Sequence, residues 1–271
     1  MSDMTTELNS DRDPWQALRE FTAARIALGH TGVSQLTRAQ LDFQLAHARA
    51  RDAVHQTLDT AGLTQALGAA WPESRSPLLL HSAAANRMVY LQRPDLGRRL
   101  DAPSRALLPD RLGSDDRPYD LSLVVVDGLS ARAVAQNAAP LLEALRARLG
   151  TETWVLAPLA IVEQGRVAVG DEVGELLGAK IVVVLIGERP GLSSPDSMGI
   201  YMTWAPRVGL TDESRNCISN VRPAGLDIDA AAAKLHYLLL EARRRQLTGI
   251  RLKDETGGAD ALGNSDRAFL L

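Results

Sequence analysis

The chain has 271 residues, of which 45% are hydrophobic and 23% are charged, as in ordinary globular proteins. Its formal net charge of -3 gives no overall attraction to nucleic acid or to an anionic membrane, which argues against both as main partners. The single cysteine, Cys217, excludes an intramolecular disulfide and fits a reducing cytoplasm. No apolar stretch approaches the roughly 20 residues that span a membrane, and the polar, acidic N-terminus is unlike a secretory signal.

The pattern of the chain changes near residue 118. Residues 1–12 and 254–271 are polar tails that we expect to be disordered. Residues 13–118 are predicted to form an N-terminal helical region with a linker, because Pro, Gly and Asp accumulate towards its end. Residues 119–253 alternate between apolar strands and helical segments. They are predicted to form a doubly wound, mostly parallel α/β sheet domain.

Two helices are predicted in the N-terminal region. Asp13 and Pro14 suit the N-cap and the first position of a helix. A capping-box pattern at residues 37–40 starts a long helix that runs to about Thr60. One stripe of this helix is apolar: Leu41, Leu45, Ala48 and Leu58.

The second half contains the strands of the predicted sheet. They lie within these ranges: 121–126, 154–161, 181–186, 200–204 and 218–221. The helix that Ser130 caps is predicted to break or restart at Pro140, because proline removes a backbone hydrogen bond. A short helix is expected within residues 165–178, and a final one from Asp227 until Gly249 stops it.

Several common site motifs are missing from the sequence. No G-x-G-x-x-G turn follows a strand, so the usual pyrophosphate turn of a dinucleotide domain is absent. Residues 165–171 have the glycine spacing of a phosphate loop, but Asp171 stands where a lysine is needed, and its carboxylate would repel phosphate. There is no H-E-x-x-H and no G-x-S-x-G, and one cysteine cannot build a zinc site from thiolates.

Polar residues remain at three places in the sheet domain, in or after strands. They are 127–130, 187–191 and 217–220. The buried run 181–186 leads directly into the second of them, and in open α/β sheets ligands bind beyond the carboxyl ends of the strands. Right-handed crossovers place the first two at one edge of the sheet. A crevice there, without a phosphate loop, suits a large ligand held by amide hydrogen bonds and apolar contacts.

Four runs of the sequence resemble the light chain of ethanolamine ammonia-lyase. They are YLQRPDLGRRL (90–100), VVVDGLS (124–130), GRVAVGDEVGELLGAKIVVVLIGERPGL (165–192) and CISN (217–220). They occur in the order that the family has them, and the resemblance spans about residues 85–250. The N-terminal helical part is similar to the family only in general character.

The resemblance implies a two-chain lyase that converts ethanolamine to acetaldehyde and ammonia by radical chemistry on adenosylcobalamin. In that family the large chain, a TIM barrel, holds ethanolamine and most catalytic groups. The small chain helps to clamp the cobalamin with a Rossmann-like domain, and the pairs assemble into a hexamer. The resemblance therefore assigns no catalytic residue and no metal ligand to this chain, which should be inactive alone. It implies a cytoplasmic location and leaves enclosure in a bacterial microcompartment open.

Carried over residue by residue, the resemblance assigns the cobalamin contacts to Val167, Glu188 and Cys217. Glu188 can accept hydrogen bonds from corrin amides, Val167 offers backbone groups and an apolar contact, and Cys217 is small and soft enough to lie against the ring or its tail. The competing interpretations are an ion pair between Glu188 and a cation such as Arg189, and core positions for Val167 and Cys217.

Two further features bear on the cofactor. No histidine stands in the D-x-H-x-x-G pattern that supplies a lower cobalt ligand in many cobalamin domains, and the family keeps the cofactor's own benzimidazole on the cobalt. The basic run 91–100 is interpreted as a contact with the large chain or with the edge of the cofactor site, or else as a solvated turn.

Two other functions remain open at this point. The first is a nicotinamide-dependent oxidoreductase on the same architecture, which would need the missing phosphate-binding glycine turn. The second is a non-catalytic assembly subunit that makes no contact with a cofactor.

Overall fold

The computed structural model describes residues 14–22, 24–72, 76–108, 118–150 and 152–255, so the predicted tail 1–12 and all but two residues of the tail 254–271 lie outside it. The N-terminal elements are η1 (Pro14–Glu20), β1 (His30–Thr31), β2 (Ser34–Gln35), α1 (Thr37–His55) and α2 (Thr60–Ala70). Then come β3 (Leu78–His81), α3 (Arg87–Gln92), η2 (Leu96–Arg98) and α4 (Ala102–Leu107). The remaining elements are β4 (Leu121–Val126), α5 (Ala131–Leu149), β5 (Ala160–Glu163), α6 (Val169–Leu176), β6 (Ile181–Gly187), β7 (Met198–Trp204), η4 (Asp212–Ser214), β8 (Arg215–Val221), α7 (Ile228–Arg245) and η5 (Gly249–Arg251).

A six-stranded sheet of order β3-β5-β4-β6-β7-β8 forms the centre of the molecule. The first four strands in this order are parallel, while β7 pairs antiparallel with both β6 and β8. The predicted α/β fold with a mostly parallel sheet is therefore confirmed. The strand β3 comes from before residue 118, so the sheet includes one strand from the segment predicted as helical, and the proposed domain division stays a prediction.

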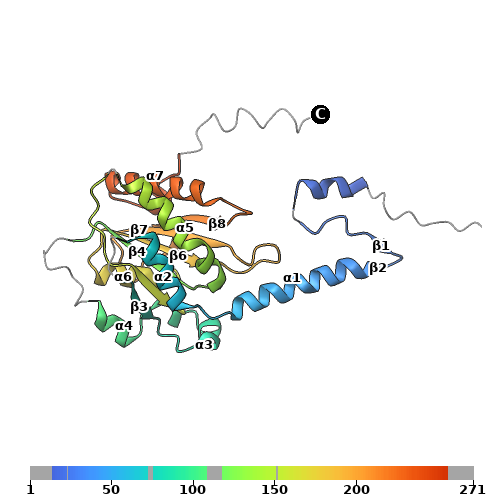
Figure 1. Cartoon of the computed structure of the whole chain (residues 1–271), viewed down its shortest axis with the longest axis horizontal. Coiled ribbons are helices and arrows are strands. Elements are labelled where there is room, and N and C mark those ends of the chain that lie inside the picture. Colours follow the sequence, from blue (N-terminus) through green and yellow to red (C-terminus); the bar gives the residue numbers. More distant parts are fainter. Residues whose placement is uncertain (1–13, 23, 73–75, 109–117, 151, 256–271) are drawn as a thin grey trace, which may run out of the picture.

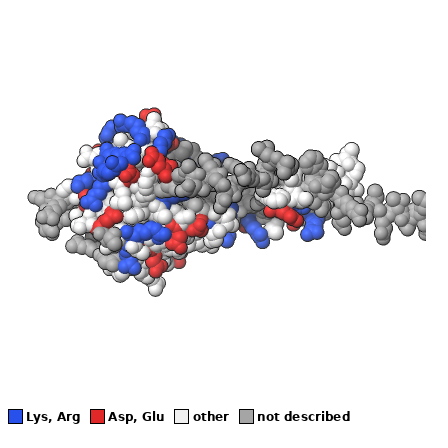
Figure 2. Space-filling view, turned by 90° about the horizontal axis from the view of Figure 1, so that it is seen from above, with Lys and Arg blue, Asp and Glu red and all other residues white. Residues whose placement is uncertain are grey.

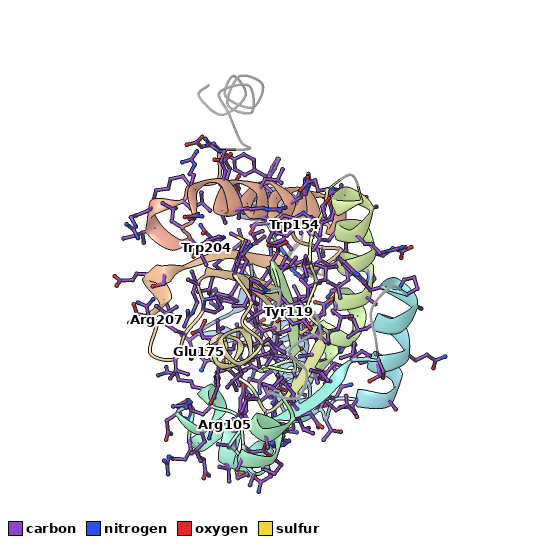
Figure 3. The ribbon with its side chains drawn as sticks, turned by 90° about the vertical axis from the view of Figure 1, so that its left-hand side faces the viewer. Arg105, Tyr119, Trp154, Glu175, Trp204 and Arg207 are labelled. Carbon is purple, nitrogen blue, oxygen red and sulfur yellow. The ribbon has the colours of Figure 1, made fainter. Side chains whose placement is uncertain are left out.

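Helices cover both faces of the sheet, and the two faces have separate cores. On one face the strands pack with α2, α5 and α7 around leucines, alanines and methionines. On the other face, Val182, Val184 and Ile186 pack with Val169 and Val173 of the short helix α6. Figure 3 shows Trp154 beside α7 and Glu175 on α6, at opposite faces of the sheet. All seven residues of β6 are buried, as expected for a central strand.

The carboxyl ends of β4, β6 and β8 lie at one edge of the sheet. Because β7 runs antiparallel to both neighbours, β8 points in the same direction as β6, and Met198 pairs with both Gly187 and Val221. The backbone N–H of Leu129 donates to the carbonyl of Gly187 at 2.9 Å, which joins the turn after β4 to the end of β6. The prediction that the first two polar stretches meet is confirmed, and the third ends at the same edge.

The predicted break of a helix at Pro140 is wrong. The helix α5 continues from Ala131 to Leu149 with Pro140 inside it. The face of α5 that carries Pro140 is exposed, whereas Val134, Ala138 and Leu141 on the opposite face are fully buried. This burial on both sides of the proline offsets the lost backbone hydrogen bond. Ser130 caps the helix as predicted, accepting from the N–H of Ala133 at 3.2 Å.

Two predicted helix ends also differ from the structure. The capping box at 37–40 does not form: Leu36 is the N-cap of α1 and provides no side-chain cap, and the helix ends at His55 rather than near Thr60. The helix α7 starts at the predicted place, with Asp227 as its N-cap, but Gln246 ends it in a left-handed conformation, before Gly249.

The helix α1 and the elements before it form an arm that projects from the body of the molecule (Figure 1). Of the predicted apolar stripe, Leu41 and Leu45 are 58% and 52% exposed and lie outside the core, whereas Leu58, after the end of α1, packs against it. Near the body, Arg25 donates to the carbonyl of Leu192 at 3.4 Å. Basic side chains gather on the opposite end of the molecule, with acidic ones among them (Figure 2).

Gly187 is required by the close approach of the turn after β4. A Cβ there would lie 2.1 Å from the carbonyl oxygen of Ser130, a backbone atom that cannot rotate away. We expect Gly187→Ala to destabilise the fold by about 3 kcal/mol or more, and to lower Tm by about 6–12 °C in thermal unfolding followed by circular dichroism.

The matched control is Gly68→Ala in α2, where a Cβ meets nothing within 4 Å. Alanine favours the helix there, so Tm should stay or rise slightly. Equal Tm values for the two variants would contradict the packing argument.

Candidate functional site

The crevice where ligands usually bind in open α/β sheets is filled by the protein itself. The chain leaves β4 towards α5 on one face and leaves β5 towards α6 on the other, so the crevice lies between the ends of these two strands. Arg87 of α3 occupies it. Its Nη1 donates to the carbonyl of Gly128 at 2.7 Å and lies 3.5 Å from Oε1 of Gln164, and its Nε donates to the carbonyl of Val54 at 2.7 Å.

Tyr90 and Asp127 complete this filled crevice. The guanidinium groups of Arg87 and Arg166 lie 4.8 and 4.2 Å from the centre of the Tyr90 ring, which is fully buried. Asp127 lies 3.7 Å from Arg87 and accepts the N–H of Gly165 at 3.2 Å. Burial outweighs these contacts and raises the pKa of Asp127 to about 6. The cluster is a structural support, and it closes the usual nucleotide crevice.

Glu188 lies at the open side of the same edge, directly after β6. The hydroxyl of Ser197 donates to its Oε2 at 2.5 Å, and the backbone N–H of Asn220 lies 3.3 Å from the same oxygen. Within the described residues it forms no ion pair with Arg189, so the competing ion-pair interpretation is not what the structure shows. A carboxylate has room for about four hydrogen bonds, so Glu188 can still accept others.

Cys217 is an exposed residue in the middle of β8, paired with Tyr201 of β7. The hydroxyl of Tyr201 hydrogen-bonds the thiol. Partial desolvation raises the pKa of Cys217, and the carboxylates of Glu188 and Asp212 raise it further. The thiol is therefore protonated near neutral pH, which makes it a poor nucleophile.

Val167 lies in the turn between β5 and α6 and lines a groove of about 640 Å³. The other side of this groove includes Asp212, the carboxylate that acts on Cys217. Val167 is partly exposed, so it is not a pure core residue.

Of the three predicted contact residues, Glu188 and Cys217 lie near each other, and Val167 lines the groove that also includes Asp212. Glu188 and Cys217 influence each other electrostatically, and Asp212 connects Cys217 to the groove of Val167. On the α6 face of the sheet, Tyr201 of β7 is partly exposed and Cys217 of β8 is exposed, whereas Arg215 at the start of β8 is buried against Asp171 of α6. Gly199 lies on this face, and a Cβ there would come within 3.0 Å of Glu188 and 3.2 Å of Tyr201. Gly199 therefore leaves the space that the side chains of Glu188 and Tyr201 occupy.

Sequence reasoning missed Arg87, Tyr90 and Arg166. Arg87 and Tyr90 lie on a short helix that showed only as an apolar run beside turn signals, and no periodicity places them in the crevice. Gly97 was a usable signal of close packing at this place. A Cβ there would lie 2.9 Å from Arg166 and 3.1 Å from Tyr90. Among the described residues, no three His, Cys, Asp or Glu side chains are grouped to hold a metal ion.

Comparisons with known proteins agree on one family. The sequence model described as "Ethanolamine ammonia-lyase light chain (EutC)" matches residues 12–253. A protein from Ralstonia nicotianae named ethanolamine ammonia-lyase small subunit is 59% identical over 260 residues, covering 96% of this chain and 95% of the relative. Proteins of the same name from Pseudomonas aeruginosa and Azotobacter vinelandii are 58% and 55% identical, over 264 and 270 residues. These two alignments cover 97% and 99% of this chain and 96% and 99% of the relatives.

The buried Asp127 should leave a signature in the dependence of stability on pH. Because its pKa is about 6 in the fold and near 3.8 otherwise, protonation favours the fold, and the fold gains stability as the pH falls from 6 to 4. The gain is on the order of 3 kcal/mol, and we expect Asp127→Asn to remove it. The free energy of unfolding in urea, measured at pH values from 4 to 7, tests this.

Asp229→Asn is the matched control, because the Asp229 side chain is 82% exposed. Its pH curve should run parallel to that of the unsubstituted protein. If the Asp127→Asn curve runs parallel as well, the buried carboxylate is not the source of the dependence.

Proposed function

The chain belongs to the ethanolamine ammonia-lyase light-chain family, and on that premise we propose that it forms one wall of an adenosylcobalamin site shared with a large subunit. The observation that carries this proposal is the open face of β7 and β8, where Glu188, Tyr201 and Cys217 lie together beside Gly199. When bound, adenosylcobalamin would supply a carbon radical for the conversion of ethanolamine to acetaldehyde and ammonia.

The residues of this face fit the chemistry of a corrin edge. Amide side chains are hydrogen-bond donors, and Glu188 is a charged acceptor whose position is fixed by Ser197 and Asn220. Cys217 and Tyr201 offer an uncharged surface, since burial and neighbouring groups raise the pKa of both. The role of this chain is to bind, orient and shield the cofactor from water, while the large subunit holds ethanolamine and most catalytic groups.

The nicotinamide alternative is disfavoured by the filled crevice. A dinucleotide would need the space between the ends of β4 and β5, and the side chains of Arg87 and Tyr90 occupy it. The assembly-subunit alternative predicts that Glu188 has no effect on cobalamin affinity, which the experiment below tests.

The arm is the surface that we assign to the large subunit. Two leucines on one stripe of α1, Leu41 and Leu45, are more than half exposed, and the relatives are named small subunits, which implies a partner chain. We further propose the hexamer of pairs that the family resemblance implies. No helix in the described part of the chain combines the length and apolar character needed to cross a membrane. A cytoplasmic location, with or without a microcompartment, is likewise our proposal.

The first test measures cobalamin binding and ammonia release with each chain alone and with both chains co-expressed. We expect activity in the mixture only. Glu188→Gln should weaken adenosylcobalamin about tenfold or more, through loss of charge-assisted hydrogen bonds worth about 1.5–3 kcal/mol. The exposed Glu143→Gln in α5 is the matched control and should bind normally. Unchanged affinity for Glu188→Gln, with the complex intact, would favour the assembly-subunit alternative.

The second test concerns the arm. The double substitution Leu41→Glu and Leu45→Glu places charge on its exposed apolar stripe, so co-purification with the large chain should fall about tenfold or more. The exposed Gln44→Glu on the same helix should have little effect. If the leucine variant binds the large chain normally and instead loses self-association in gel filtration, the stripe is a contact between copies of this chain.

A further inference from the structure

A groove runs beside Val167, between the η2 segment and the loop before β8. Its volume is about 640 Å³, and its basic residues are Arg98, Arg99, Arg166 and Arg215. From the groove we infer a subsite for a phosphodiester anion, the one carried by the nucleotide loop of cobalamin. This inference rests on the proposed function and extends it to residues outside the three predicted contacts.

Most charges in the groove are already compensated. Arg99 pairs with Glu172 at 3.0 Å, and Arg215 pairs with Asp171 at 2.7 Å. The two carboxylates of the groove are also occupied: Asp95 pairs with Arg93 at 2.7 Å, and Asp212 lies 3.4 Å from Arg215.

Two positive charges therefore remain for a ligand. Arg98 is exposed, and in the part of the chain that the structure describes it pairs with no carboxylate. Arg166 likewise pairs with no carboxylate within the described residues. Its Nη2 donates to the carbonyl of Tyr90 at 3.3 Å. An arginine fork without a carboxylate partner is the geometry that binds phosphate oxygens well.

The position of Arg166 is fixed before any ligand arrives. Its guanidinium stacks on the Tyr90 ring at 4.2 Å, and its backbone N–H donates to the carbonyl of Gly97 at 2.7 Å. Its Nε is buried and has no hydrogen-bond partner in the described structure. A partly desolvated guanidinium without a carboxylate partner is costly by itself, and an anion in the groove would compensate its charge.

The groove adjoins the proposed cofactor surface through Val167 and through Asp212, whose charge acts on Cys217. The corrin amides of cobalamin are neutral, and its only anionic group is the phosphodiester of the nucleotide loop. The two uncompensated arginines therefore select this group rather than the ring.

The test compares two ligands of the co-expressed two-chain complex: adenosylcobalamin, and adenosylcobinamide, which lacks the nucleotide loop and its phosphate. Binding is followed by the cobalamin absorption spectrum. We expect Arg98→Ala to lower the affinity for adenosylcobalamin about tenfold, because a charge-assisted hydrogen bond is lost. Arg98→Glu should lower it further, because the carboxylate also repels the phosphodiester. Both variants should leave the affinity for adenosylcobinamide unchanged.

Arg98 is exposed, so its variants should fold, and Arg166→Lys tests the second arginine with its charge kept but its fork lost. The exposed Arg132→Ala in α5 is the matched control and should bind both ligands normally. Equal losses for the two ligands, or no loss for either, would overturn the phosphodiester subsite while leaving the proposed function in place. Failure of the unsubstituted complex to bind adenosylcobalamin would overturn the proposed function, and the subsite with it.

Discussion

The buried guanidinium of Arg87 is the contact on which the arrangement of this molecule depends. It joins α1 through Val54, the turn after β4 through Gly128, and the turn after β5 through Gln164. It also compensates the buried carboxylate of Asp127, which would otherwise be an isolated charge in the protein interior. One side chain thus fixes the base of the arm and closes the crevice between the two strands.

Closing that crevice moves the available binding surface along the sheet. The short helix α6 covers β4 and β6 and buries Arg215 at the start of β8 through Asp171, but further along the antiparallel strands Tyr201 is partly exposed and Cys217 is exposed. The other face of these strands packs against α5 and α7, which keeps them rigid. An open, rigid sheet face with an arm projecting beside it suits a chain that completes its site with a partner.

The sequence predicted what depends on local pattern. The unbroken apolar run of β6 and the cap at Ser130 follow from local composition and capping, and the structure has both. Pro140 shows the limit of that reasoning, because burial of α5 along its whole length outweighs the local cost of a proline. The strand β3 is only four residues long and comes from a segment predicted as helical, so no local signal placed it in the sheet.

The residues of the candidate site also divide into those that the sequence predicted and those that it did not. Glu188, Cys217 and Val167 were assigned by resemblance; the fold places Glu188 near Cys217, and Val167 in the groove that also includes Asp212. Arg87, Tyr90 and Arg166 form a network that depends on long-range contacts, such as the hydrogen bond from Arg166 to Tyr90, which are 76 positions apart in the sequence. Glu188 and the arginines of the groove have opposite charges. An acceptor, Glu188, lies at one end of the surface, and the uncompensated arginines lie in the groove beyond Asp212. A ligand with amide donors on one part and an anion on another can satisfy both ends in only one orientation, so the surface would fix how its ligand faces the partner chain.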